Sequence, residues 1–95
     1  MGTRQRNMET LIELGLNYKF VKDELLGLLP QNYSEGPKKD LNEELFADES
    51  VWIFGKVIQK KEIYIKLKIR ETDNHEEVVC ISFHIAKYPM NYPFK

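Results

Sequence analysis

Two short segments of this 95-residue chain carry a phenol, an imidazole and several cations at alternate positions. The first segment has Tyr64, Lys66, Lys68 and Arg70, and a later one has His84 two residues after a serine. Successive side chains of a β-strand point to opposite faces, so each set lies on one face of its strand. If the apolar residues of both strands share one side of a sheet, the phenol, the imidazole and the cations share the other side.

These groups match what RNA cleavage without a metal ion requires. A base must take the proton of the ribose 2′-hydroxyl, an acid must protonate the leaving 5′-oxygen, and the negative charge of the phosphorane must be stabilised. His84 can serve as acid or base near neutral pH, and neighbouring cations would lower its pKa. The cations can hold phosphates, and Tyr64 can donate a hydrogen bond or stack on a base. The pattern does not assign which residue is acid and which is base.

A plainer interpretation exists, because the wet side of any antiparallel strand carries Lys, Arg and Tyr. The charge distribution adds information. Residues 1–50 have a net charge of −4 and residues 51–95 of +3, although the whole chain has only −1. Within Gly55 to Arg70 there are six basic residues and one acidic residue. This stretch is therefore the candidate surface for an anionic partner.

The elements that position these residues follow from periodicity and capping signals. Asn7 and Gly15 bracket a short helical pattern, and Asn17 can cap a second helix that ends by Pro30. The segment up to Ser50 predicts a loop with a short helical turn. Alternating or β-branched runs predict strands over residues 51–58, 62–70 and 78–85.

The chain is therefore expected to be one α+β domain over residues 1–95, with two or three short N-terminal helices packed on a three-stranded antiparallel sheet. We expect a helical part over residues 6–50 and a β-meander over residues 51–85. A tail over residues 86–95 cannot continue a central strand, because it contains two prolines, and should wrap over the domain. Its contacts would come from Tyr88, Met90, Tyr92 and Phe94.

The sequence does not decide which side chains of the first strand share a face with the basic row. A two-residue turn at Lys60 and Lys61 would set Gly55 opposite Lys66 and leave a gap above the basic row. A slip of one residue would bring Lys56 into that row instead. In the third strand, alternation places Cys80 on the same face as His84.

Several classes of protein and site are excluded or disfavoured. No apolar run is long enough to span a bilayer and no signal peptide is evident, so a cytoplasmic protein without membrane contact is expected. Cys80 is the only cysteine, which excludes an intramolecular disulfide and a thiolate metal cage. His75 and His84 lack paired carboxylates nearby, so we expect neither a metal nor a cofactor.

The order of segments resembles the MqsR family of toxins from bacterial toxin–antitoxin systems, small ribonucleases with a RelE-like α+β fold. The similarity is spread over roughly residues 7–95 and includes no single catalytic signature. The matching segments are LGLN at 14–17, LLGLLPQNY at 25–33, the GPKKD that follows, VWIFG at 51–55, YIKLKI at 64–69, CISFH at 80–84 and YPF at 92–94.

The resemblance implies sequence-selective cleavage of messenger RNA, independent of the ribosome and neutralised by a cognate antitoxin protein. Tyr64 matches a tyrosine of the family's ribonuclease site, whereas His84 stands where better-studied members have a lysine. Ser34 stands near the position of a loop lysine, so Lys38 or Lys39 would have to replace it, and Ile53 stands where a glutamine occurs. We expect a catalytic group of Tyr64, His84 and Lys66. The residues expected to bind RNA are Lys38, Lys39, Lys56, Lys68 and Arg70.

One departure from the family concerns the amino terminus. Related chains begin with a further helix and strand before the segment that matches RNMETLIELGL, so this chain resembles a truncated copy. Either a partner supplies the missing element or the domain is marginally stable. The alternative to an active ribonuclease is thus a non-catalytic module of the same fold that binds RNA or protein.

Overall fold

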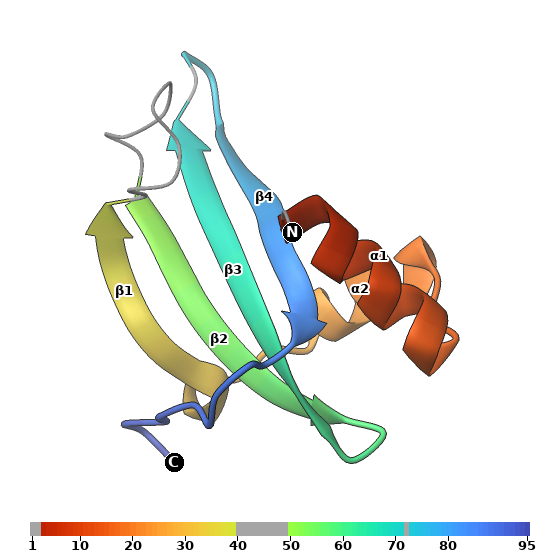
Figure 1. The fold of residues 1–95 in the computed structure, drawn as a ribbon. Coiled ribbons are helices and arrows are strands. Elements are labelled where there is room, and N and C mark those ends of the chain that lie inside the picture. Colours follow the sequence, from red (N-terminus) through yellow and green to blue (C-terminus); the bar gives the residue numbers. More distant parts are fainter. Residues whose placement is uncertain (1–2, 40–49, 72) are drawn as a thin grey trace.

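The chain folds into one antiparallel sheet with two helices, as seen in a computed structural model that describes residues 3–39, 50–71 and 73–95. The side chains of residues 3, 4, 38, 39 and 71 lie outside this description. The predicted α+β class is confirmed (Figure 1). The elements in chain order are α1 (Thr3–Leu14), α2 (Tyr18–Leu26), a 3-10 turn η1 (Pro30–Asn32), β1 (Tyr33–Lys39), β2 (Ser50–Ile58), β3 (Lys61–Glu71) and β4 (Glu76–Ile85).

The strand count predicted from the sequence is wrong, because the described residues form four strands in the order β1-β2-β3-β4. The added strand β1 lies inside the part expected to be helices and loop. Its Gly-Pro pair predicts a loop, because Pro is tolerated in a sheet only at an edge or at a bulge. Gly36 has φ +123°, and a Cβ there would lie 2.8 Å from the Val51 carbonyl oxygen, so only glycine lets β1 approach β2. The helical turn expected before Ser50 falls outside the described residues.

Helix α1 lies along the outer edge of β4 (Figure 1). Its side chains hydrogen-bond to the backbone of that strand. The Asn7 amide donates to the Ile81 carbonyl at 3.1 Å and accepts from the Phe83 N–H at 3.0 Å. Thr10 Oγ1 accepts from the Ile85 N–H at 3.0 Å. Asn7 is therefore not the expected helix cap, since α1 begins at Thr3. Its amide satisfies edge groups of β4 that would otherwise be open to another strand.

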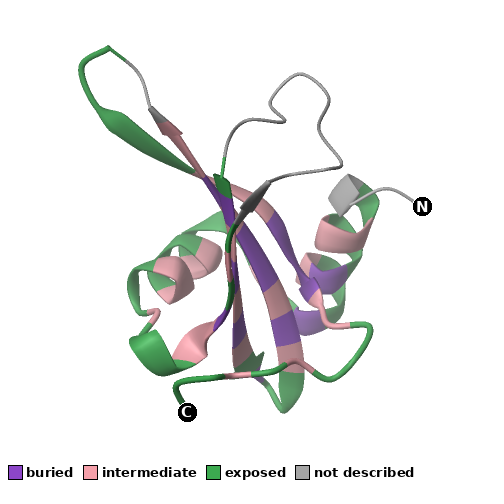
Figure 2. Cartoon of the chain, turned by 90° about the vertical axis from the view of Figure 1, so that its left-hand side faces the viewer, coloured by how far each residue is buried: buried purple, intermediate pink, exposed green. Residues whose placement is uncertain are grey.

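Helix α2 covers one face of the sheet, which we call the packed face. Its predicted cap is confirmed, because the Asn17 side chain accepts a hydrogen bond from the Phe20 N–H at 2.9 Å. Apolar side chains of α2 pack against a buried cluster. In Figure 2 the buried stretches of chain lie mainly on the strands. The buried members of that cluster are Leu14, Ile58, Ile63, Ile65 and Phe83.

The turn between β2 and β3 fixes which side chains share a face. Gln59 and Lys60 occupy it with φ of 51° and 67°, as a two-residue hairpin of this hand requires, and Ile58 pairs with Lys61. The turn thus lies one residue earlier than the Lys60-Lys61 alternative. Gly55 pairs with Tyr64, and Lys56 points to the packed face.

A bulge in β4 places Cys80 on the other face of the sheet from the one that the sequence predicts. Lys66 pairs with Ser82 but the next residue, Leu67, pairs with Cys80, which leaves one extra residue in β4. The extra residue reverses the alternation. Cys80 therefore packs against the core cluster, and not beside His84 as simple alternation predicts.

Within the described ranges, no helix has the length and apolar character needed to cross a membrane.

Candidate functional site

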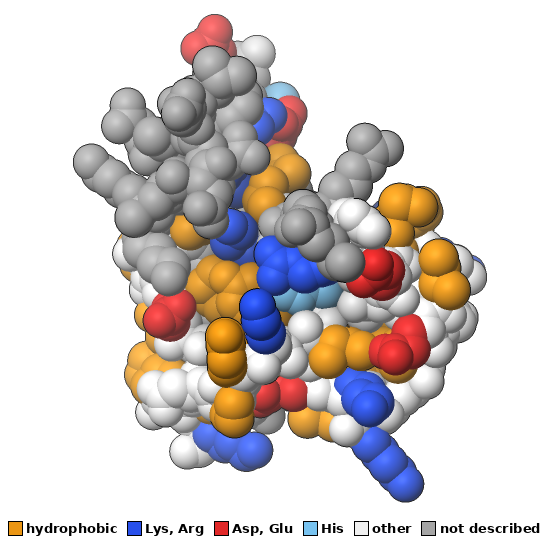
Figure 3. All heavy atoms as spheres, viewed as in Figure 1, with side chains coloured by type: hydrophobic (Ala, Val, Ile, Leu, Met, Phe, Trp, Pro, Cys, Tyr) orange, Lys and Arg blue, Asp and Glu red, His pale blue; other side chains and the backbone are white. Residues whose placement is uncertain are grey.

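Tyr64 and His84 lie directly opposite each other on β3 and β4, on the face that α2 does not cover, which we call the open face. Their rings are stacked with centroids 5.2 Å apart and an interplanar angle of 16°. This contact confirms that the two residues share one surface, as alternation predicts. Figure 3 shows this side of the molecule, with Lys and Arg side chains gathered near its centre.

The hydrogen bond of His84 identifies which ring nitrogen carries the proton. Nδ1 lies 3.0 Å from the carbonyl oxygen of Ile85. A carbonyl only accepts, so Nδ1 must be the donor, and the neutral ring then has its lone pair on Nε2. His84 is only 6% exposed, yet it lines the pocket described below. The backbone therefore orients the imidazole so that its basic nitrogen is Nε2.

The surroundings of His84 favour the neutral imidazole. Burial lowers its pKa from the usual 6.5, and the positive charges of Arg6 and Lys66 lower it further. The hydrogen bond to the Ile85 carbonyl raises the pKa; its influence is smaller than that of burial but larger than that of either charge. At neutral pH the ring is uncharged and can accept a proton.

Arg6 is a member of this site that the sequence pattern does not reveal. It lies in α1, one residue before the asparagine that fixes this helix to the edge of β4. The Arg6 Nε is buried and has no hydrogen-bond partner in the part of the chain that the structure describes. No sequence signal marks it, because its place depends on how α1 docks on the sheet.

The open face is hollowed into a pocket of about 470 Å³ around these groups. The strands supply Ile53, Tyr64, Lys66, Ser82 and His84 to its lining. Arg6 comes from α1, Ser34 and Glu35 come from β1, and the tail after β4 supplies residues 86–91. Among the residues that the structure describes, three cations, Arg6, Lys66 and Lys87, thus line the pocket together with one carboxylate and the imidazole. The pocket has the size and charge to receive a small anionic group.

The tail is fastened across the end of the open face. Glu62 accepts hydrogen bonds from the Met90 N–H at 3.1 Å and from the Tyr92 hydroxyl at 2.7 Å. Tyr92 and Met90 also lie so close over Gly55 that any side chain there would collide with them. The space above Gly55, which the sequence analysis left open under one of its two turn alternatives, is thus filled by the protein's own tail. Tyr88 and Phe94, which were also expected to help wrap the domain, are exposed, but the Phe94 ring contacts Tyr33 of β1 with centroids 5.2 Å apart.

Of the residues expected to bind RNA, none whose side chain is described lines the pocket. Lys68 and Arg70 lie further along β3 than Lys66, the expected catalytic lysine, which does line it, and Lys68 is only 1% exposed. The side chains of Lys38 and Lys39 lie outside the described residues, although both backbones belong to β1. Ser34 and Ile53, which replace polar residues of the resembled family, both line the pocket.

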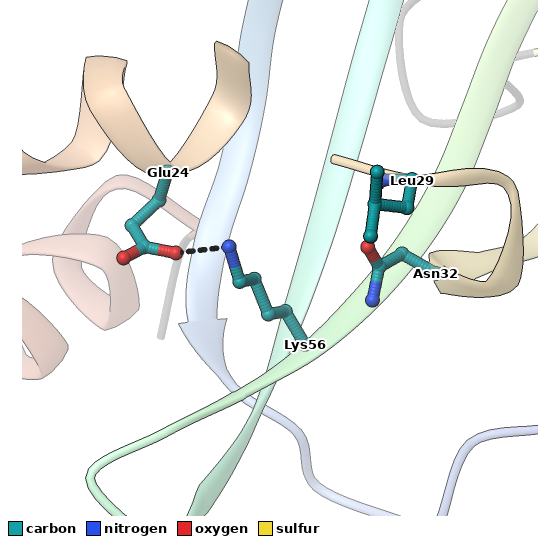
Figure 4. A network of polar contacts seen from close by, with 4 residues as sticks. All are labelled: Glu24, Leu29, Asn32 and Lys56. Atoms are coloured by element: carbon teal, nitrogen blue, oxygen red, sulfur yellow. Dashed lines mark hydrogen bonds and ion pairs between the residues drawn. The ribbon is translucent and has the colours of Figure 1, made fainter. Parts of the chain in front are cut away.

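Lys56 is placed on the opposite side of the sheet from the pocket. Its Nζ lies 2.5 Å from Glu24 Oε2 of α2 (Figure 4). The same view shows the turn in which the Asn32 side chain accepts a hydrogen bond from the Leu29 N–H. The cause is the hairpin register, which points Lys56 toward the helix. Lys56 is therefore removed from the set of residues expected to contact RNA at this site.

Among the described residues, no group of three or more His, Cys, Asp and Glu side chains could hold a metal ion. Comparisons with known proteins identify no relative: no protein-family model, no curated protein and no solved structure matches the chain. What this pocket does must therefore be inferred from its own residues.

Proposed function

We propose that this chain is an endoribonuclease that cleaves messenger RNA by attack of a ribose 2′-hydroxyl on the neighbouring phosphorus. The observation that carries the proposal is the state of His84: it is stacked on Tyr64, donates through Nδ1, has a lowered pKa and stands among cations. A neutral imidazole in such surroundings is suited to take a proton from a hydroxyl whose oxygen attacks a phosphate.

In the proposed reaction, His84 Nε2 accepts the proton of the 2′-hydroxyl while the oxygen attacks phosphorus. Arg6 and Lys66 stabilise the charge of the phosphorane, and the Lys66 ammonium protonates the leaving 5′-oxygen. Tyr64 acts as a positioning residue, because its ring holds the imidazole in place. The products are a 2′,3′-cyclic phosphate and a 5′-hydroxyl end.

The biological setting follows from the resemblance to the MqsR family and is part of the same proposal. The protein would act as the toxin of a toxin–antitoxin pair, located in the cytoplasm and held inactive by a cognate antitoxin. Its RelE-like character is supported by the four-stranded antiparallel sheet with helices packed against it.

The test is incubation of the purified protein with a long unstructured RNA in excess EDTA, followed by analysis of the new ends. The wild type should give cyclic-phosphate and 5′-hydroxyl ends, and His84→Ala should cleave about 10²- to 10⁴-fold more slowly, the usual loss of a general base. Lys56→Gln is the matched control, because it removes a lysine from the other face, and its rate should be unchanged.

Intact RNA after incubation with folded wild-type protein would contradict the proposal. If such a protein still binds RNA, the non-catalytic binding module becomes the better description. Cleavage that His84→Ala leaves unchanged would show that the chemistry occurs elsewhere.

A further inference from the structure

One wall of the pocket is formed by the tail after β4, and this wall is fixed rather than loose. Residues 86–91 line the pocket, and the Glu62 carboxylate binds the tail directly beyond Pro89 through Met90 and Tyr92. The Ala86 N–H also donates to the Glu62 backbone carbonyl at 2.8 Å. The wall is thus fastened on both sides of residues 87–89, so a ligand would meet it already in place.

Tyr88 lies on this wall and is 71% exposed. So exposed a ring contributes little to the core, and its position at the pocket is not required by packing. Lys87 Nζ lies 5.9 Å from the centre of the ring, and Arg6 and Lys66 line the same pocket. Proteins bind single-stranded nucleic acids with this combination: the exposed aromatic ring stacks on a base, and the cations neutralise the phosphate backbone.

We propose that Tyr88 forms a base-binding subsite, on which a base of single-stranded RNA stacks while a neighbouring phosphate is held by Arg6 and Lys66. The proposal rests on the proposed ribonuclease function for its class of ligand and deepens it by naming the strandedness of the substrate. A paired base is stacked inside its duplex and cannot reach the ring. The pocket volume of about 470 Å³ suits a nucleotide unit rather than a helix.

The experiment measures binding of a fluorescent, fully 2′-O-methylated single strand, which has no free 2′-hydroxyl and cannot be cleaved. Tyr88→Ala should weaken binding by about tenfold, within the range of one lost stacking contact. Tyr88→Phe keeps the ring and should bind within about twofold of wild type, because stacking needs no hydroxyl. The same strand annealed to its complement should bind more weakly, and Tyr88→Ala should not change that binding.

Tyr18 supplies a matched control, since it is 80% exposed but starts α2 and does not line the pocket. Tyr18→Ala should bind the single strand like wild type. The subsite is overturned if Tyr88→Ala binds as tightly as wild type, if both alanine variants weaken binding equally, or if the duplex is preferred. Thermal unfolding of each variant confirms that the fold is retained.

The two proposals fail in distinguishable ways. Loss of affinity in Tyr88→Ala without any cleavage by the wild type would support the subsite and overturn the ribonuclease. Cleavage that depends on His84 together with unchanged affinity in Tyr88→Ala would support the ribonuclease and overturn the subsite.

Discussion

The two faces of the sheet place two lysines of one basic stretch in different surroundings. On the packed face, Lys56 meets Glu24 of α2 at 2.5 Å, so its charge is neutralised within the fold. On the open face, Lys66 and Arg6 stand beside an imidazole whose pKa they help to lower. One lysine therefore completes the packing of a helix, while the other contributes positive charge to a pocket.

This difference shows that a run of basic residues in the sequence does not define a binding surface. Lys56 and Lys66 belong to the same basic stretch, and the hairpin register separates them onto opposite faces. The register is fixed by the turn at Gln59 and Lys60, which lies between the two lysines in the sequence. The face on which each lysine lies thus depends on the backbone conformation of this turn.

The largest effect should come from the packed face. Ile65 is fully buried in the core cluster, so Ile65→Ala should lower the free energy of unfolding by about 2 to 5 kcal/mol through lost burial and a cavity. Urea denaturation followed by circular dichroism measures this change. On the open face, Lys66→Gln should change stability much less, and an equal loss would erase the distinction between the faces.

Cys80 gives the next largest contrast, because the β4 bulge turns it toward the core. Burial raises its pKa from 9.0 to about 11, and a hydrogen bond with the Ser82 backbone, which lowers the pKa, is the smaller influence. Two pKa units reduce the thiolate fraction about 100-fold at a given pH. Reaction with a colorimetric disulfide reagent should be slower by about that factor in the native protein than in concentrated urea. Equal rates would mean that Cys80 faces solvent on the open side.

The paired lysines allow a smaller but sharper comparison. Lys66→Gln should weaken binding of single-stranded RNA and reduce the slope of log affinity against log salt by about 0.7, the value for one lost phosphate contact on a single strand. Lys56→Gln should change neither quantity, since that lysine is bound to Glu24 on the far side. Fluorescence anisotropy over a salt series makes the measurement. If Lys56→Gln lost more affinity than Lys66→Gln, RNA would bind the packed face, and the proposed site on the open face would be contradicted.

Much of the fold and part of the site follow from local sequence rules. Strand alternation places Tyr64 and His84 on one face, and the structure stacks their rings. The Asn17 cap is equally local and equally predictable. These features depend only on the period of a strand or on the first turn of a helix.

The features that were not predicted depend on longer-range packing. β1 carries a Gly-Pro pair that signals a loop, and only its pairing with β2 makes it a strand. Alternation misplaces Cys80, because a bulge adds one residue to β4 without any mark in the sequence. Arg6 reaches the pocket because the amide of Asn7 binds the edge of β4, a contact across 74 residues of chain. Such contacts follow from docking and leave no periodic signal.

The most direct test of the proposed site is an NMR pH titration of His84 in the full chain, with His75→Gln used to assign its signal. We predict a pKa below 6.5, because burial and the charges of Arg6 and Lys66 outweigh the hydrogen bond to the Ile85 carbonyl. We also predict a neutral ring protonated on Nδ1, because that carbonyl can only accept. Because the folded state resists protonation, this group makes the protein less stable as the pH falls below about 6.5, and kcat/KM should rise with pH over the same range. A pKa at or above 6.5, or a ring protonated on Nε2, would contradict the role of His84 as the base.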